Sequence, residues 1–365
     1  MIKKVDKLII TITFLMIVFS FITLYSSCHQ NNLFVRKDIF FRQIFWSVIG
    51  VLLMFIFSRL DYRKLWDFVW PFYIFILFTL LLVLFLGASR MGAQRWLDIG
   101  ILNFQPSEFA KLSIIILLSR KFAKVSVNKF NISRTNILWL ETFVFPLKFV
   151  LIPLILVMLQ PDLGTALMLI FIFLMMSYFV GVKNKYIFSF LGISILFFPL
   201  FWHFLRPYQK NRLLVFLNPN RDPLGAGYTI IQSKIAIGSG RIFGKGWLGG
   251  TQNQLNFLTE RHTDFIFSTI GEEWGLVGGL FLIFLFFVLS YRIVKISRLV
   301  SDPFAKNICG GIASWLTIQA FINLAMTMGI MPVVGLPLPL FSYGGSSLVA
   351  FLISFGIILN ISKNI

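Results

Sequence analysis

The stretch VWPFYIFILFTLLLVLFLG, residues 69–87, has no charged side chain. It is long enough to cross a bilayer as a helix, which takes about 20 mostly apolar residues. Comparable stretches recur along the 365-residue chain, which is 58% hydrophobic and 13% charged. Soluble domains carry roughly 25% charged residues. The composition therefore excludes a water-soluble globule and predicts an all-α polytopic membrane protein.

The apolar pattern predicts about ten transmembrane helices in one integral membrane domain, residues 1–365. The expected spans are 8–27, 41–58, 69–87, 107–120, 142–159, 163–181, 186–205, 265–290, 308–330 and 341–360. The long segment 206–264 between the seventh and eighth spans is expected to be a structured extracytoplasmic loop, because structureless loops of such length are rare. Within it, Tyr228, Ile231 and Ile235 form a helical stripe typical of a surface-lying or re-entrant helix.

The net charge of +19 is interpreted as a topology signal and not as a nucleic-acid footprint. When the amino terminus is placed in the cytoplasm, most Lys and Arg residues fall in the inner segments. The short outer loops then contain only Arg36, Lys37, Arg42, Arg90 and Arg95. The positive-inside rule therefore predicts that both termini are cytoplasmic.

Asp264 is the sharpest candidate for chemistry. It ends the sequence ERHTD, residues 260–264, where the long loop enters an apolar helix. One interpretation is an N-cap, since Asp is favoured there. The other is that a carboxylate at the membrane boundary, beside Arg261 and His262, acts as a general base or binds a divalent cation.

Other ionisable or glycine-rich positions allow two interpretations each. Glu108 and Lys111 are spaced i,i+3 and either neutralise each other or line a polar cavity. Glu272 is either functional or structural, paired with a cation on another helix. The sequence GSGRIFGKG, residues 238–246, does not match a phosphate-binding P-loop.

Several blocks then occur in order from residue 91 to the carboxyl terminus. They are MGAQRWLD (91–98), FQPSEFAK (104–111), QPDLGTA (160–166), GGTQNQLNFLTERHTDFIF (249–267), GEEWG (271–275), MPVVG (331–335) and PLPLFSYGGSS (337–347). Together they resemble the SEDS family (shape, elongation, division, sporulation) of bacterial cell-wall synthesis. The TQNQLNF and ERHTDF segments resemble its RodA, or elongation, branch more than its division branch.

The resemblance implies a peptidoglycan glycosyltransferase of the bacterial cytoplasmic membrane. Such an enzyme polymerises lipid II into glycan strands during cell-wall elongation. It implies a class B penicillin-binding protein, a transpeptidase, as partner within the elongation machinery, and no nucleic acid. Mg²⁺ or Mn²⁺ is a candidate cofactor, with Asp264 as a candidate ligand, and no organic cofactor is expected.

By motif, Asp264 corresponds to the family's essential aspartate, and Glu108 and Lys111 to its ion pair. The expected substrate-binding or cavity residues are Glu108, Lys111, Arg212, Lys245, Arg261, His262 and Thr263. The main alternative function is a transporter (flippase) for the lipid-linked precursor, which would depend most on Glu108 and Lys111. A non-catalytic activator of the penicillin-binding protein is a further alternative.

Overall fold

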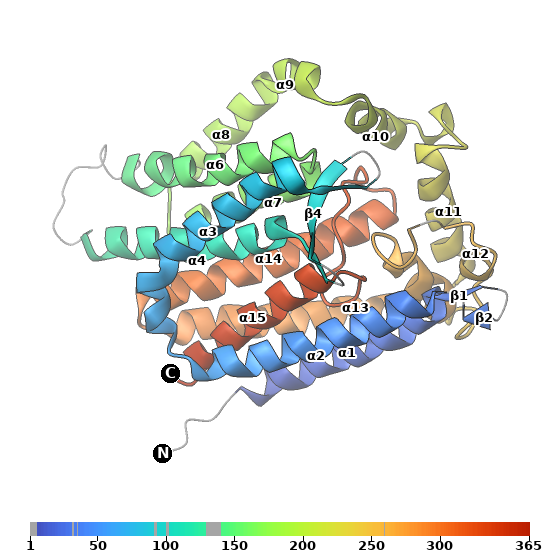
Figure 1. Cartoon of the computed structure of the whole chain (residues 1–365), viewed down its shortest axis with the longest axis horizontal. Coiled ribbons are helices and arrows are strands. Elements are labelled where there is room, and N and C mark those ends of the chain that lie inside the picture. The colour runs from blue at the N-terminus through green and yellow to red at the C-terminus, as the bar shows by residue number, and fades with distance from the viewer. Residues whose placement is uncertain are drawn as a thin grey trace.

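The computed structural model describes residues 6–30, 33–34, 36–90, 93–99, 102–128, 140–258 and 260–365. Met91 and Gly92 of the MGAQRWLD block lie outside these residues. The fold is a bundle of long helices, in which α1 begins and α15 ends at the same end (Figure 1). The main helices are α1 (Lys7–Ser27), α2 (Lys37–Arg59), α3 (Leu65–Leu86), α4 (Pro106–Asn128), α6 (Phe145–Leu159), α7 (Leu163–Phe179), α8 (Asn184–Leu196), α9 (Phe198–Phe204), α13 (Ile266–Leu299), α14 (Pro303–Thr327) and α15 (Gly345–Ser362).

Short elements connect these helices. At the end opposite the termini, β1 (His29–Gln30) pairs with β2 (Leu33–Phe34), and β4 (Ala93–Ile99) pairs with both β3 (Ala88–Arg90) and β5 (Leu102–Phe104), all antiparallel. The turn η1 (Tyr62–Lys64) precedes α3, and the π-helical turn η2 (Leu140–Val144) precedes α6.

Each predicted span coincides with a helix, but the helices differ in their capacity to cross a membrane. Among the described residues, seven spans are long and apolar enough by themselves, and the bent pair α8 and α9 raises this to eight. The pair bends by 42° at Phe197. Two predicted spans fall short for physical reasons: α7 has only 17 residues, and α4 carries several charges, including Glu108 and Lys111. The prediction of about ten spans is therefore not confirmed by length and hydropathy.

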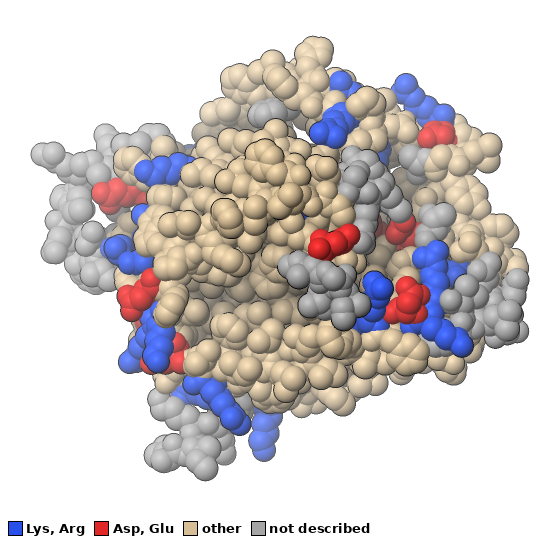
Figure 2. Space-filling model, in the orientation of Figure 1, with Lys and Arg blue, Asp and Glu red and all other residues tan. Residues whose placement is uncertain are grey.

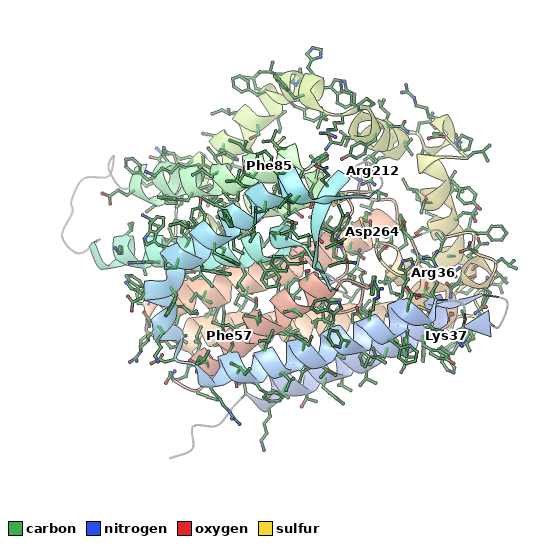
Figure 3. All side chains as sticks on the ribbon, in the orientation of Figure 1. Arg36, Lys37, Phe57, Phe85, Arg212 and Asp264 are labelled. Atoms are coloured by element: carbon green, nitrogen blue, oxygen red, sulfur yellow. The ribbon has the colours of Figure 1, made fainter. Side chains whose placement is uncertain are left out.

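The core lies around α14 and α15, whose apolar windows are 83% buried, against 28% for α2. Trp315 of α14 and Phe351 of α15 stack with ring centroids 4.1 Å apart. Many outward-facing side chains are large and apolar; Phe85, for example, is 80% exposed (Figure 3). On the face drawn in Figure 2, charged side chains gather toward the two ends of the bundle, with a broad uncharged band between them. This pattern is that of a multi-pass membrane protein.

The segment 206–264 is folded into α10 (Pro207–Leu217), η3 (Pro219–Arg221), α11 (Ala226–Ser239) and α12 (Thr251–Gln254). The helix expected around Tyr228 is present as α11, and the face that packs against the protein is a different one from the stripe of Tyr228, Ile231 and Ile235. Ile230, Ser233 and Ala236 are buried, whereas Ile235 is 45% exposed. The Ser233 hydroxyl lies 2.6 Å from that of Ser268 in α13, so a polar contact fixes the face that hydrophobicity alone did not identify.

Helix α13 is broken at Gly275, where φ is +63°, and the glycine loop (residues 240–246) fills the break. The N–H groups of Leu276 and Val277 donate to carbonyls of this loop at 2.9 and 3.1 Å, and loop N–H groups donate to two carbonyls of α13 at 3.0 Å. A Cβ on Gly244 would lie 2.1 Å from a carbonyl oxygen of α13. The glycines therefore allow close backbone packing, which explains the glycine-rich sequence without a bound phosphate.

Candidate active site

Asp264 lies in the turn that leads into α13, at the end of the bundle opposite the termini (Figure 3). The N-cap of α13 is Phe265, and no side chain caps its first turn. The N-cap interpretation of Asp264 is therefore wrong, because the helix begins one residue too late for this carboxylate to reach its free N–H groups. The side chain is half-buried and remains available for chemistry.

Arg212 of α10 approaches Asp264 across Gly335. A Cβ at Gly335 would lie 3.6 Å from both Arg212 Nη1 and Asp264 Oδ2, so these atoms are no farther apart than twice that distance. Gly335 has φ +77°, a conformation that favours glycine. The guanidinium is held in place because its Nη1 donates to the Val333 carbonyl at 3.2 Å. The segment 333–335 thus orients the cation and leaves space beside the acid.

A cavity of about 130 Å³ lies at this point. Its lining combines charged side chains with an apolar wall: Arg212, Glu260 and Asp264, with Val215, Thr229, Ile230, Phe265 and Val333. Since a water molecule takes up about 30 Å³ in the liquid, the cavity has room for a reacting group and its neighbours. Pockets that hold a drug-sized ligand measure roughly 300–1,000 Å³, so the rest of a large substrate would extend beyond this cavity.

The surroundings of Asp264 make its carboxylate a stronger base than an ordinary aspartate. Burial, and after it repulsion from the neighbouring Glu260 carboxylate, raises the pKa of Asp264 to about 6, although Arg212 and Arg95 act in the opposite direction. At neutral pH such a group is still mostly ionised. The carboxylate is therefore mostly unprotonated and still has a raised affinity for protons, and a general base requires both properties.

The three residues before Asp264 do not surround its carboxylate in a common pocket. Arg261 is buried and donates to the carbonyls of Ser27, at 2.7 Å, and Asn253, so it joins α1 to α12. His262 is buried, and burial followed by repulsion from nearby arginines lowers the pKa of its imidazole to about 4, which keeps it neutral. Thr263 donates to Glu260 Oε2 at 2.9 Å and so orients the second carboxylate of the cavity.

Glu108 and Lys111 form the expected ion pair, with Lys111 Nζ 2.9 Å from the Glu108 carboxylate. Both are fully buried, and neither is among the residues that line the Asp264 cavity. Lys111 also donates to Gln319 Oε1 at 2.9 Å, and the Gln319 amide donates to the Pro337 carbonyl at 2.9 Å. The pair therefore links α4 through α14 to the segment that contains Gly335.

Lys245 does not reach the Asp264 cavity either. Its ammonium contacts Glu272 at 2.8 Å, and Glu272 also accepts from the N–H groups of Gln252 and Asn253 at 3.0 and 3.3 Å. Glu272 thus caps the first turn of α12 while pairing with a cation from another segment. This arrangement agrees with the structural interpretation of Glu272.

Sequence reasoning did not single out two charged residues near the cavity, Glu260 and Arg95. Glu260 lies one helical turn before Asp264 in sequence and faces the same cavity. Arg95 lines a narrow crevice together with Arg212 and donates to the Pro161 carbonyl. The sequence signal that could have identified Arg95 is its position within the MGAQRWLD block.

The cavity contains oxygen donors that suit a divalent cation. Glu260 and Asp264 offer two carboxylates to one cavity, and Mg²⁺ is often bound by one or two carboxylates completed by substrate phosphates. In the part of the chain that the structure describes, no three His, Cys, Asp or Glu side chains come together. The residues therefore fit a cation shared with a phosphorylated substrate better than a cation held by protein alone.

Comparison with known proteins places this geometry in context. The family model for FtsW, RodA and SpoVE, described as "Cell cycle protein", matches residues 6–365. Peptidoglycan glycosyltransferase MrdB of Escherichia coli is 39% identical over 359 residues, covering 98% of this chain and 93% of MrdB. Stage V sporulation protein E of Bacillus subtilis is 35% identical over 363 residues, covering 98% of this chain and 97% of the relative.

Solved structures are similar over the whole chain. The rod shape determining protein RodA of Thermus thermophilus aligns with a TM-score of 0.73 and 29% identity, over 99% of this chain and 97% of RodA. A chain from a peptidoglycan synthase complex that coordinates polymerization and crosslinking aligns with a TM-score of 0.82 and 30% identity, over 99% and 98%. Sequence and structure agree over nearly every residue, and the chain therefore belongs to the FtsW, RodA and SpoVE family of cell cycle proteins.

Proposed function

We propose that this chain is a peptidoglycan glycosyltransferase that polymerises lipid II into glycan strands during cell-wall elongation. The observation that carries the proposal is the Asp264 carboxylate, with its pKa raised to about 6, beside Arg212 at one small cavity. The names of the relatives, which include the glycosyltransferase MrdB, support this activity.

The reaction joins a sugar hydroxyl of one molecule to the anomeric carbon of another. As the new carbon–oxygen bond forms, the bond from that carbon to the pyrophosphate oxygen breaks. Asp264 takes the hydroxyl proton, and the pyrophosphate leaves with the bonding electrons. Arg212 supplies a fixed positive charge for the departing group, which a guanidinium can bind through two N–H donors. Inverting glycosidases use one carboxylate as the base and a second as the acid that protonates the leaving group. A pyrophosphate departs as an anion without such an acid, so by analogy one carboxylate is sufficient here.

A divalent cation would be held by Asp264 and Glu260 together with substrate phosphate oxygens, where it would supply further charge neutralisation. In that arrangement Asp264 would be a metal ligand and no longer the only group that accepts the hydroxyl proton. Activity that persists when Mg²⁺ and Mn²⁺ are omitted from the assay excludes an obligatory metal and supports Asp264 as the base.

The topology that suits this chemistry places the Asp264 end of the bundle outside the cytoplasm. Counting α4, α7 and the bent pair α8 and α9 as spans gives ten crossings, with both termini in the cytoplasm. The segment 206–264 then lies outside the bacterial cytoplasmic membrane. Inner positive charges, including those on α4 and around η1, support this orientation.

A class B penicillin-binding protein is the proposed partner, as a transpeptidase that cross-links the new strands within the elongation machinery. Support comes from the similar chain in a peptidoglycan synthase complex that coordinates polymerization and crosslinking. The transporter alternative has less structural support, because its expected residues, Glu108 and Lys111, are fully buried and pair with each other.

The test uses purified protein in liposomes with its penicillin-binding protein and fluorescent lipid II. Wild type is compared with Asp264→Asn and with the matched control Asp302→Asn, which alters a carboxylate that accepts the Phe304 N–H at the amino terminus of α14. Glycan ladders from wild type and Asp302→Asn but not from Asp264→Asn support the proposal. Equal ladders from all three contradict it, and lipid II crossing the bilayer without ladders favours the transporter.

A further inference from the structure

The backbone of the turn 262–264 accepts three hydrogen bonds in succession from one neighbouring region. The donors are, in order, the Tyr343 N–H at 2.8 Å, the Ser342 hydroxyl at 2.5 Å and the Asn323 amide at 3.0 Å. Each carbonyl of the turn, including that of Asp264 itself, is therefore fixed. The donors come from α14 and from the segment just before α15, about 60–80 residues away in sequence.

Asn323 connects the two walls of the site. Its side chain is fully buried in α14, and Nδ2 donates both to the Asp264 carbonyl at 3.0 Å and to the Leu336 carbonyl at 2.7 Å. Leu336 directly follows Gly335, which separates Asp264 from Arg212. The Asn323 amide thus fixes the backbone of Asp264 relative to that of Gly335 and Leu336.

Ser342 supports the same geometry from the other side. Its hydroxyl donates to the Thr263 carbonyl and accepts from the Leu338 N–H at 2.8 Å. Its own carbonyl accepts from Gln43 Nε2 of α2 at 3.3 Å. Through these hydrogen bonds the buried Ser342 connects the turn 262–264, the proline-rich segment before α15 and α2.

We propose that Asn323 and Ser342 are positioning residues for glycosyl transfer, holding the Asp264 carboxylate toward Arg212 through the backbone of residues 263 and 264. The inference rests on the proposed function of Asp264. Neither side chain lines the cavity, so neither touches the reacting atoms. A displacement of about 1 Å at a reacting group can cost about 10²-fold in rate, and loss of either donor removes one of the three hydrogen bonds that hold the turn.

The chain offers a matched control in Asn360 of α15. This residue is also buried, donates to the Ser58 carbonyl at 3.1 Å, and accepts from the Tyr62 N–H at 3.0 Å. It lies near the carboxyl-terminal end of α15, far from the Asp264 cavity. Asn360→Ala removes a comparable pair of buried hydrogen bonds, so it reports the effect of lost stability alone.

The experiment measures kcat and KM for lipid II, together with thermal unfolding, for the full chain with its penicillin-binding protein. Asn323→Ala is expected to lower kcat about 10²-fold with KM unchanged. Asn360→Ala is expected to lower the unfolding temperature comparably while keeping kcat. Wild-type kcat in Asn323→Ala, or an equal loss of kcat in Asn360→Ala, overturns the inference.

A second pair of variants covers the case in which Asn323→Ala does not fold. Ser342→Ala removes a single hydroxyl and is expected to lower kcat, and Ser342→Thr, which restores a hydroxyl, is expected to recover it. Full kcat in Ser342→Ala overturns the inference. If Asp264→Asn is inactive and Asn323→Ala is fully active, the positioning role of Asn323 is refuted but the proposed function stands. If Asp264→Asn is active, the proposed function is refuted as well.

Discussion

Replacing Gly335 by alanine should abolish activity without a matching loss of stability. The new methyl carbon would lie 3.6 Å from both Arg212 Nη1 and Asp264 Oδ2, an ordinary van der Waals distance, so it fits without a clash. It would nevertheless occupy space next to both the cation and the base. The reacting hydroxyl and the departing oxygen need that space, so the substrate could no longer approach both groups.

The magnitude follows from two separate effects. The left-handed backbone at φ +77° costs an alanine about 1–2 kcal/mol, which lowers the free energy of unfolding. Exclusion of the reacting group affects only the rate. Displacement by about 1 Å can cost about 10²-fold, and a methyl group next to both partners displaces the substrate by at least that much.

The assay compares lipid II polymerisation and thermal unfolding for Gly335→Ala and for Gly181→Ala. Gly181 also has a left-handed φ, +85°, but a Cβ there meets nothing within 4 Å. Both variants should lose similar stability, and only Gly335→Ala should lose activity. Equal activities in the two variants would refute the reasoning that Arg212 and Asp264 act on one group across Gly335.

Three further outcomes are expected. Polymerisation should fall as the pH drops through about 6, because protonation of Asp264 removes the acceptor for the hydroxyl proton; a pH–rate profile with its midpoint near 4 would contradict the raised pKa. Lys111→Met should lower the free energy of unfolding by about 3–5 kcal/mol, since it leaves the buried Glu108 carboxylate unpaired, and the double variant with Glu108→Gln should recover much of that loss in chemical unfolding. Gly244→Ala should lower the unfolding temperature more than Gly246→Ala, because both have positive φ but only the first brings a Cβ within 2.1 Å of a carbonyl oxygen; equal shifts would show that the loop yields easily.

The features that depend on neighbours along the chain were predictable. Runs of apolar residues located the helices, because each membrane helix satisfies its own backbone hydrogen bonds within one segment. The i,i+3 spacing of Glu108 and Lys111 predicted their ion pair, because side chains three residues apart lie on the same face of a helix. The buried face of α11 was not predicted, because it includes Ser233, whose hydroxyl contacts Ser268 of α13, and hydrophobicity does not mark a serine.

The role of the glycine-rich sequence 238–246 also required the tertiary structure. The sequence shows only that this stretch is not a P-loop. Its actual partner is the broken backbone of α13, which begins twenty residues later, and such backbone pairing leaves no distinctive side-chain pattern. Likewise, Arg261 and Lys245 were plausible substrate cations by charge and place, but their partners are Ser27 and Glu272 in distant segments.

The sequence by itself determined the class of protein, the approximate helices and Asp264 as the candidate acid, because composition, periodicity and motif are local properties. Only the tertiary structure decided what surrounds that acid. Arg212 and Gly335 come from opposite sides of it in the chain, and Asn323 fixes its backbone from α14. Contacts between segments so far apart depend on how the helices pack, and packing is a property of the whole bundle that no single stretch of sequence contains.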